Sequence, residues 1–526
     1  MGAGGKPGWL VWTLLAAFLA LIVTSAVVRI QAYGPFHPDS VSYLSAAESL
    51  AGLHGYASKI DFGGSSGENV QLPQPVTSWP MAYSLAVSRL NALGVPLVSA
   101  GYVESILAHL ALILTVFVIL SRRHAPSSAL IGAALVGLTP ALFRSATYPL
   151  SESLFVAFVA LTIADVAPRD GELNMASVAA GGIFASLATL TRYVGFALPL
   201  GVVPWILLRR SPLRTRIRAA IEFTAPWLAI TATCLAVNIV RGGTPFGDRY
   251  IELTNPIRTV ARILAGSAAG IANVTEVTQP SIGDEKWVGL AILIVGAAIL
   301  FYFKRSLLAY LRMPLGQLYG CTAAAFVLVF FVARSTIAFD TIGPRFITPI
   351  VFLAALALVD AYLPEGVLRP TARATLGAIV GALLVLYATF PMARLVKNPA
   401  SEPPEPSESA FIARHLNEDE VVLMFWSNRV NCYFPNYVVP LPSPLTEATL
   451  KKIVEGTEDA MDASPRIRVG LSPIILLIPT PETMKGIPDD LGPFVRRLAA
   501  GSYPPWLDPM FTDADGFTAY ECVPVK

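Results

Sequence analysis

Long apolar runs without charged residues constrain the fold of this chain more than any other feature. Residues 9–28 form the first run, and about 20 apolar residues are enough for an α-helix to cross roughly 30 Å of hydrocarbon. Of the 526 residues, 54% are hydrophobic and 14% are charged, and the mean hydropathy is +0.59. The composition predicts a polytopic α-helical membrane protein. The net charge of +2 is too small to indicate a nucleic-acid partner.

A cleaved signal peptide is the alternative for residues 9–28, because Lys6 precedes the run and residues 24–26 (TSA) resemble a cleavage site. The run exceeds the roughly 7–15 apolar residues of a signal peptide, so we expect a retained helix. Further apolar spans lie at residues 96–120, 126–143, 151–167, 175–190, 194–208, 219–240, 286–303, 315–333, 346–362 and 372–392. They predict about eleven crossings. The spans 175–190 and 194–208 are short, and we do not expect both to cross fully.

The positions of lysine and arginine predict the orientation. With the N-terminus inside, the cytoplasmic loops contain Arg122, Arg123, Arg169, Arg209, Arg210, Arg214, Arg216, Arg218, Lys304, Arg305, Arg312, Arg369 and Arg373. The opposite orientation would export all of these clusters, against the positive-inside bias. We therefore expect a cytoplasmic N-terminus and an extracytoplasmic C-terminus.

Two segments on the predicted outer side are too long to be plain connectors: residues 31–95 and residues 241–285. In the first, apolar residues recur at helical spacing from residue 39 to 55, and serines fill most of the other face. This pattern predicts an amphipathic helix on the bilayer surface. A second surface helix is expected after the sequence WPMAY at residues 79–83.

The tail beyond residue 392 has a different composition. It begins with a proline-rich linker, and residues 421–426 and 474–478 have the pattern of buried strands. We expect a transmembrane module at residues 1–392 and a small exported α/β domain at residues 393–526. Cys432 and Cys522 both lie in this tail, where an oxidising compartment would permit a bridge, but their spacing does not show whether they meet.

Two carboxylates are placed on the predicted outer side. Asp39 follows the first span and begins the surface helix, where the alternative role is an N-cap contributing about 1 kcal/mol. Glu152 begins a span, where the alternative role is to complement the helix dipole. In the predicted topology both face the same side at the same depth. This convergence predicts a functional site there.

Four arginines also lie on the predicted outer side, at helix ends or in loops: Arg144, Arg192, Arg249 and Arg345. Any one of them could extend to the lipid headgroups while its stem stays in the bilayer. Exported arginines run against the orientation bias, however, and arginine binds phosphate through a planar fork of donors. Together they predict an anion site.

Histidines and a buried acid give weaker signals. His37 and His54 flank the surface helix, and the His-x-Asp spacing of His37 and Asp39 fits a divalent cation without being specific for one. Glu104 and His109 fall within the second span, where ionisable groups are functional candidates. Glu104 is close to the outer end, and a hydrogen bond to a neighbouring helix is the alternative role for His109.

These motifs together resemble the bacterial GT-C glycosyltransferases, and most closely the protein O-mannosyltransferase and aminoarabinose-transferase-like branch (glycosyltransferase family 39-like). The resemblance covers roughly residues 10–390. Its motifs, in the expected order, are PDSVSYL at 38–44, LHGY at 53–56, WPMAY at 79–83, SESLF at 151–155, LTRYVG at 190–195 and PRF at 344–346. Relatives often read WPPGY where this chain has WPMAY. No second acid follows Asp39 and no Glu-Lys pair lies near Trp79, so the substrate and metal dependence stay open.

The resemblance implies a GT-C fold and a polyprenyl-phosphate sugar as donor, transferred with inversion to a hydroxyl acceptor outside a bacterial inner membrane. It implies that Asp39 is the general base and that Glu152 is a second acidic site residue. The expected phosphate-binding residues are Arg192, Arg345, Arg249 and Arg144, and the expected sugar or acceptor pocket comprises His37, Tyr43, His54, Trp79, Tyr83 and Tyr193. No cofactor is certain; a divalent metal ion is an open alternative, with Asp39, Glu152 and His37 as candidate ligands.

A membrane transporter is the main alternative from another functional class. It predicts ionisable residues or broken helices near the bilayer midplane, whereas most spans here have charge-free centres. A flippase or ligase of lipid-linked sugars is a nearer alternative. The sugar is not specified by the sequence, and the acceptor can be a glycan, a lipid or a protein.

Overall fold

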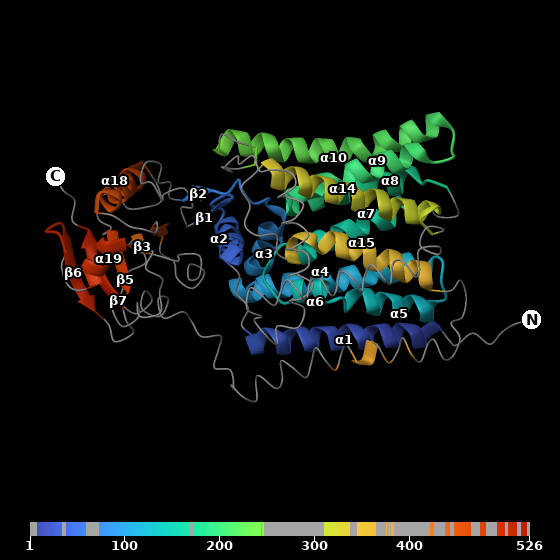
Figure 1. Ribbon diagram of the computed structural model, residues 1–526, viewed down its shortest axis with the longest axis horizontal. Coiled ribbons are helices and arrows are strands. Elements are labelled where there is room, and N and C mark those ends of the chain that lie inside the picture. Colours follow the sequence, from blue (N-terminus) through green and yellow to red (C-terminus); the bar gives the residue numbers. More distant parts are fainter. Residues whose placement is uncertain are drawn as a thin grey trace, which may run out of the picture. The chain divides into compact units, whose positions relative to one another are not determined.

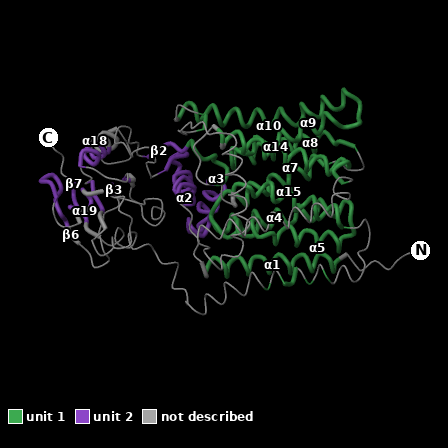
Figure 2. Tube along the Cα trace, viewed as in Figure 1, with its two compact units in different colours: residues 1–35, 77–83, 102–399 green, residues 36–76, 84–101, 400–526 purple. Residues whose placement is uncertain are grey.

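The structure is a computed structural model, drawn in Figure 1. It describes residues 8–33, 38–58, 73–167, 172–242, 245–246, 310–336, 344–363, 375, 378, 380–382, 385, 421–424, 437–441, 447–463, 474–479, 492–499, 503–512 and 517–522. The chain divides into two compact units (Figure 2). Unit 1 contains residues 1–35, 77–83 and 102–399, and unit 2 contains residues 36–76, 84–101 and 400–526.

Unit 1 is a bundle of apolar helices. They form because a chain in hydrocarbon can satisfy its backbone N–H and C=O groups only within helices or closed barrels. The described elements are α1 (Gly8–Tyr33), most of α4 (Leu97–Ser121), α5 (Pro126–Gly137), α6 (Pro140–Ser145), α7 (Glu152–Val166), α8 (Met175–Thr191), the 3₁₀ helix η2 (Tyr193–Phe196), α9 (Ala197–Leu208), α10 (Leu213–Gly242), α14 (Pro314–Thr336) and α15 (Pro344–Tyr362).

The helices of unit 1 pack along their lengths (Figure 1). α8 packs against both α7 and α10, and α14 packs against both α9 and α15. The crossing of α8 and α10 depends on Gly182, because a Cβ atom there would lie 2.2 Å from the backbone oxygen of Phe223. Small residues allow this close approach of membrane helices, which have no hydrophobic effect between them. Large side chains such as Trp205, Phe155 and Phe326 fill the buried core.

The structure divides one predicted span and confirms the break between two others. The expected span 126–143 is divided, because Thr139 has an extended backbone (ψ 125°) before Pro140, which begins α6. The break between the spans 175–190 and 194–208 is confirmed. There Arg192 is extended (φ −151°, ψ 130°) between α8 and η2, and Gly195 follows with room for no Cβ against the Thr189 backbone.

The helices of unit 1 include several that fit a bilayer, which makes the chain an integral membrane protein. Among the described residues, four are long and apolar enough to cross it: Trp9–Gln31, Leu97–Ser121, Leu213–Arg241 and Pro314–Ala333. Four apolar helices are shorter: Pro126–Gly137, Met175–Thr191, Tyr193–Leu208 and Phe346–Tyr362. The predicted span 286–303 and most of 372–392 lie outside the described residues. The count of about eleven crossings therefore stays a prediction.

A buried carboxylate, Asp360 of α15, joins several parts of unit 1 at one end of the bundle. Its Oδ2 accepts a hydrogen bond from Arg123 Nη1 at 2.7 Å, and its Oδ1 lies 2.7 Å from Nε2 of His124. The Tyr310 hydroxyl donates to Oδ2 as well. Burial, and then the nearby Tyr319 and Asp360, raise the pKa of Tyr310, which keeps its proton available for this bond. Both oxygens of Asp360 are thus satisfied.

The first part of unit 2 contains α2 (Pro38–Ala51), the short pair β1 (Ala57–Ser58) and β2 (Gln74–Pro75), and most of α3 (Ala82–Ala92). Helices are present at both positions where surface helices were predicted, and their place on the bilayer surface stays a prediction. The polar side of α2 differs from the expected pattern. Ser42, Ser45 and Ser49 are buried, and short hydroxyl side chains can be satisfied locally. Ser49 Oγ donates to the Gly55 carbonyl at 2.9 Å, and Ser45 Oγ accepts from Ser58 Oγ at 3.2 Å.

The tail of unit 2 contains a five-stranded sheet in the order β4-β3-β5-β7-β6. β3 (Val421–Met424) is parallel to β4 (Tyr437–Pro440) and β5 (Ile474–Pro479), and β7 (Phe517–Cys522) is antiparallel to β5 and to β6 (Leu507–Thr512). β3 and β5 correspond to the two predicted buried strands. Side chains of these strands form one core with α18 (Glu447–Ala463) and α19 (Gly492–Ala499). Cys432 lies outside the described residues, so the question of a bridge to Cys522 stays as the sequence left it.

Candidate functional site

A buried ion pair joins the first residue of α7 to the break after α8. Glu152 Oε1 lies 2.5 Å from Arg192 Nη1, and the side chains are only 2% and 16% exposed. The same Nη1 donates to Ser151 Oγ at 3.3 Å, and the guanidinium lies 5.5 Å from the centre of the Phe346 ring. The extended backbone at Arg192 turns its side chain out of the helical register of α8. A guanidinium is thereby fixed between a carboxylate and an aromatic face.

Only one of the two oxygens of this carboxylate has a hydrogen-bond partner among the described residues. Among the described residues, Glu152 Oε2 has no hydrogen-bond partner although it is buried, and the same holds for the adjacent Ser153 Oγ. Buried polar atoms are nearly always hydrogen-bonded, so an orphaned oxygen indicates a group that binds something else or stores free energy. The arrangement can hold an anion at Arg192 and accept a hydrogen bond at Glu152.

Tyr193 joins three segments of unit 1. Its hydroxyl donates to the Thr77 carbonyl at 2.7 Å and accepts from Asn238 Nδ2 of α10 at 2.8 Å. Asn238 Nδ2 also donates to the Pro245 carbonyl at 3.0 Å, and the Phe246 ring meets the Tyr193 ring edge to face at 5.2 Å. Tyr193, which follows Arg192 in the sequence, therefore connects Thr77, α10 and residues 245–246.

Residues 77–83 are held at both of their ends. Thr77 contacts Tyr193, as above, and the Tyr83 hydroxyl lies 3.3 Å from Ser105 Oγ, which also donates to the Leu150 carbonyl at 3.4 Å. Leu150 precedes the Ser151–Glu152 pair and Tyr193 follows Arg192. The half-buried Trp79 lies between these two anchors, whereas Tyr83 is fully buried. Hydrogen bonds of Tyr83 and Tyr193 thus attach the two ends of this segment to the residues that adjoin Glu152 and Arg192, and Trp79 lies between them in the sequence.

Arg144 belongs to a different group. Its Nη2 donates to the Tyr148 hydroxyl at 3.3 Å, and the guanidinium lies 5.5 Å from the centre of that ring. Arg29 of α1, which the sequence pattern did not single out, donates through Nε to Thr147 Oγ1 at 3.2 Å. A role of Arg144 in phosphate binding stays a prediction.

Asp39 is described within unit 2. It lies in the first turn of α2, one residue after Pro38 begins the helix, where a carboxylate complements the helix dipole. This position is inside the helix, so the alternative role as N-cap does not fit. Asp39 is half-buried, and Tyr43, one turn along the same face, is 3% exposed. His54 is exposed in the turn after α2.

Several predicted site residues lie outside the described part of the chain. They are His37, Arg249 and the side chain of Arg345, whose backbone lies in the first turn of α15. Among the described residues, no group of three or more His, Cys, Asp or Glu side chains could hold a metal ion. Metal binding by Asp39, Glu152 and His37 stays a prediction.

Sequence reasoning missed four contributors to this region. Ser105 and Asn238 are polar residues within apolar spans, and that contrast could have identified them. Phe346 belongs to the PRF motif but was not assigned a role. Thr77 contributes through its backbone carbonyl, which no side-chain pattern can predict.

No protein-family model and no curated protein matches the chain. A crystal structure of ArnT from Cupriavidus metallidurans bound to undecaprenyl phosphate has a similar fold, with a TM-score of 0.57 and 14% identity over 99% of each chain. The apo form of that protein gives a TM-score of 0.56 and 13% identity over 97% of this chain and 98% of that one. The arabinofuranosyltransferase AftD from Mycobacteria gives a TM-score of 0.49 and 17% identity over 98% of this chain and 40% of that one. The fold shared with ArnT confirms the GT-C fold that the resemblance implied.

Proposed function

We propose that this chain transfers a sugar from a polyprenyl-phosphate donor to an acceptor hydroxyl, on the extracytoplasmic side of a bacterial inner membrane. The observation that carries the proposal is Arg192, a guanidinium fixed by a buried carboxylate 2.5 Å away at a break between two apolar helices. A cation held at the end of a membrane helix suits the phosphate of a lipid. The fold shared with ArnT, crystallised with undecaprenyl phosphate, supports the same ligand class.

In the proposed reaction, Asp39 accepts the proton of the acceptor hydroxyl as its oxygen attacks the anomeric carbon. The new carbon–oxygen bond forms while the bond from the anomeric carbon to the phosphate oxygen breaks, and its electrons leave with the polyprenyl phosphate. Attack from the face opposite the phosphate inverts the anomeric centre. A phosphate monoester is a stable anion, so no acid is needed to protonate it.

Arg192 would stabilise the charge that develops on the leaving phosphate. Glu152 acts through Arg192 and is therefore a positioning residue in this proposal. It holds one nitrogen of the guanidinium, whose five N–H donors allow further contacts to an oxyanion. Arg345, Arg249 and Arg144 are proposed as additional phosphate contacts, and His37, Tyr43, His54, Trp79, Tyr83 and Tyr193 as the sugar or acceptor pocket.

The proposed topology has the N-terminus in the cytoplasm and the C-terminal domain outside. Helix ends rich in arginine, at Arg122 and Arg123 after α4 and at Arg209 and Arg210 after α9, face the cytoplasm in this arrangement. The catalytic module comprises residues 1–392, and residues 393–526 form the exported α/β domain. In this proposal, membrane lipids surround the catalytic module and the acceptor approaches from the extracytoplasmic side.

A transfer assay tests the proposal. Membranes that contain the wild type or Asp39→Asn are incubated with a panel of radiolabelled undecaprenyl-phosphate sugars, including mannose, arabinose and amino-arabinose donors. We expect transfer from at least one donor by the wild type and a loss of about 10²-fold or more for Asp39→Asn, which cannot accept the proton. Glu48→Gln is the matched control, since Glu48 is a second carboxylate of the same helix.

Two outcomes would contradict the proposal. Full transfer by Asp39→Asn, with every donor that the wild type uses, would exclude Asp39 as the base. Equal losses in Asp39→Asn and Glu48→Gln would attribute the effect to α2 as a whole. Asp39→Glu, which retains a carboxylate, should recover part of the rate.

Transport of a lipid-linked sugar is the second candidate, and one observation favours it. Glu104 and His109 of α4 are buried, at 5% and 1% exposure, and among the described residues Glu104 Oε2 and both ring nitrogens of His109 have no hydrogen-bond partner. Ionisable groups inside a membrane helix often belong to a transport path. A transporter would move the labelled lipid between leaflets of proteoliposomes without forming a glycosylated product, and it would depend on Glu104 and not on Asp39.

A further inference from the structure

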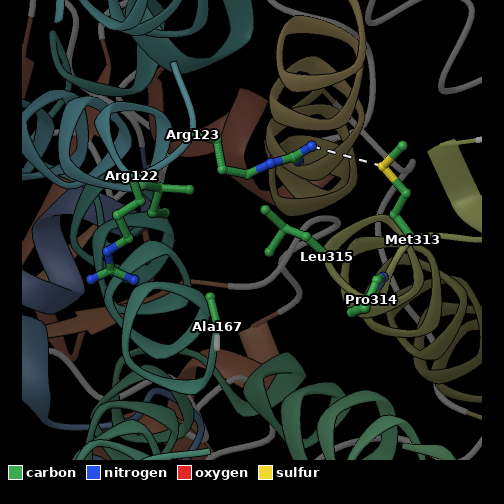
Figure 3. Close-up of a pocket in the computed structure, with 7 residues that line it drawn as sticks. Arg122, Arg123, Ala167, Met313, Pro314 and Leu315 are labelled. Carbon is green, nitrogen blue, oxygen red and sulfur yellow. Dashed lines mark hydrogen bonds between the residues drawn. The ribbon is translucent and has the colours of Figure 1, made fainter. Parts of the chain in front are cut away.

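A cavity of about 230 Å³ lies at the end of unit 1 where α4 and α7 end and α14 begins (Figure 3). Its volume is several times the ~30 Å³ that a water molecule occupies in the liquid, which leaves room for a phosphate-sized group. α7 has 15 residues, so this end of the helix is about 22 Å from Glu152. The cavity is therefore separate from the site described above.

Two consecutive arginines line one wall of the cavity. Arg122 Nη1 donates to the Ala164 carbonyl near the end of α7 at 2.5 Å, and Arg123 Nη1 donates to Asp360 at 2.7 Å. The other terminal nitrogen of Arg123, Nη2, lies 3.8 Å from the sulfur of Met313, and Figure 3 draws this contact as a dashed line. A thioether is a weak acceptor, so an oxyanion would be a stronger partner for that N–H group.

The surroundings of the cavity are also cationic. Arg209 and Arg210 follow α9 and Arg312 precedes α14, and the Trp205 indole, which bonds the Pro314 carbonyl at 2.7 Å, lies under Arg209. Together with Arg122 and Arg123 they make five arginines. Among the described residues, the acids on the neighbouring segments are Asp165, Glu172 and Asp360, and both oxygens of Asp360 have donors. An anion is thus the ligand that matches the charge.

The remaining walls are apolar, and this feature distinguishes a lipid from a soluble anion. Ile119, Ala167, Met313 and Leu315 line the cavity beside the arginines. Such walls can bury the glycerol and the first methylenes of an acyl chain, whereas inorganic phosphate would gain nothing from them. Basic pockets between transmembrane helices bind the headgroups of anionic lipids in this way.

We propose that this cavity binds an anionic phospholipid from the leaflet at this end of the bundle. The headgroup phosphate would contact Arg122 and Arg123, and the acyl chains would leave along the apolar wall formed by Leu315 and Ile119. The proposal does not depend on the glycosyl-transfer reaction, because it uses a different set of residues at the other end of α7.

Native mass spectrometry of the purified full chain in detergent tests the proposal by titration with phosphatidylglycerol. Phosphatidylcholine with the same acyl chains is the neutral comparison. We expect Arg122→Gln to weaken phosphatidylglycerol binding about ten-fold, and Leu315→Trp, which fills the cavity without changing charge, to weaken it similarly. Arg122 is used rather than Arg123 because Arg123 also holds Asp360.

The matched control is Arg210→Gln, an exposed arginine of the same end that does not line the cavity. It should change affinity by less than about two-fold. Wild-type affinity in both Arg122→Gln and Leu315→Trp would overturn the proposal, as would equal binding of phosphatidylcholine. Displacement of the lipid by an equimolar amount of soluble glycerol phosphate would assign the cavity to a soluble anion instead.

Discussion

The described part of unit 1 contains two carboxylate–arginine pairs with a buried carboxylate, one toward each end of its bundle, and they differ in how many oxygens of the carboxylate are hydrogen-bonded. Asp360 receives hydrogen bonds from Arg123, His124 and Tyr310, and both of its oxygens have a donor. Glu152 has one oxygen 2.5 Å from Arg192 and, among the described residues, no partner for the other. The first pair connects separate helices, and the second leaves bonding capacity unused.

This difference distinguishes a structural ion pair from a functional one. Removing two charges from water is unfavourable, and only complete hydrogen bonding offsets that cost, so a fully satisfied pair indicates a structural role. An incompletely satisfied pair is retained at a cost to stability, which is a common property of functional sites. Variants of the two pairs should therefore separate stability from activity.

The largest effect is expected from Asp360→Ala. It leaves the part-buried Arg123 guanidinium and the buried His124 ring without this acceptor, so the free energy of unfolding should fall by about 3–5 kcal/mol. Chemical unfolding of the purified protein in detergent measures this change. Glu222→Ala is the control, because Glu222 pairs with Arg218 at 3.6 Å on the surface and should contribute little. An unchanged stability in Asp360→Ala would show that the network is not structural.

Arg192→Gln should act mainly on the reaction. Loss of the cation removes stabilisation of the leaving phosphate, and transfer should fall about 10²–10³-fold. The protein should be destabilised less than by Asp360→Ala, since one oxygen of Glu152 loses its partner, whereas Asp360→Ala removes the acceptor of three donors. Arg192→Lys, which keeps the charge without the planar fork, should recover part of the rate. A stability loss as large as that of Asp360→Ala, with the rate per folded protein unchanged, would reverse the assignment.

Glu152→Gln should give a smaller loss, of about ten-fold in rate, because an amide retains one oxygen for Arg192 but not the charge that fixes it. Unfolding should change little. A double-mutant cycle with Arg192→Gln distinguishes a positioning role from an independent one. If Glu152 acts through Arg192, its substitution should have almost no further effect in the Arg192→Gln background, whereas additive losses would contradict that dependence.

Asn238→Leu should lower the free energy of unfolding by about 1 kcal/mol, through loss of its bonds to Tyr193 and Pro245. Because this side chain connects α10 to the loop beside Arg192, we also expect a higher KM for the lipid donor with little change in kcat. Steady-state kinetics over a donor titration measure both. Tyr193→Phe, which also loses the bond to Thr77, should have at least as large an effect on KM.

The smallest effect is expected for Glu104→Gln. A transferase with its chemistry at Asp39 does not use this buried side chain, so the transfer rate should stay within about two-fold of the wild type. The same assay that tests Asp39→Asn measures it. Loss of lipid movement between leaflets with transfer intact would favour the transport function.

Much of the helical fold was predictable, because apolar periodicity is local. The break at Arg192 was visible as a polar interruption between two short apolar spans. The break at Pro140 was not identified, since the residues on both sides of it are apolar and only the backbone restriction before proline divides them. In α2 the serine face was predictable, and its burial was not, because burial depends on what packs against the helix.

For the candidate site, the sequence predicted some of the residues but not the contacts between them. Glu152 and Arg192 were both identified from their positions at helix ends, but their contact joins residues 40 positions apart. Asp360 was not identified, although three side chains bond to it. It lies within an apolar span and its partner Arg123 is 237 positions away. Local spacing carries no information about such pairs.

The shortness of α8 has a consequence for the lipid around it. Its 17 residues span about 26 Å, less than the ~30 Å of a typical hydrocarbon layer. A bilayer adapts to such a mismatch by thinning locally, at a fraction of a kcal/mol per Å. A dimple of this kind would bring the headgroup layer toward Arg192 at the end of the helix. The phosphate of a long-chain lipid would then reach the guanidinium without leaving the membrane surface, and the proposed transfer should be fastest in thin bilayers.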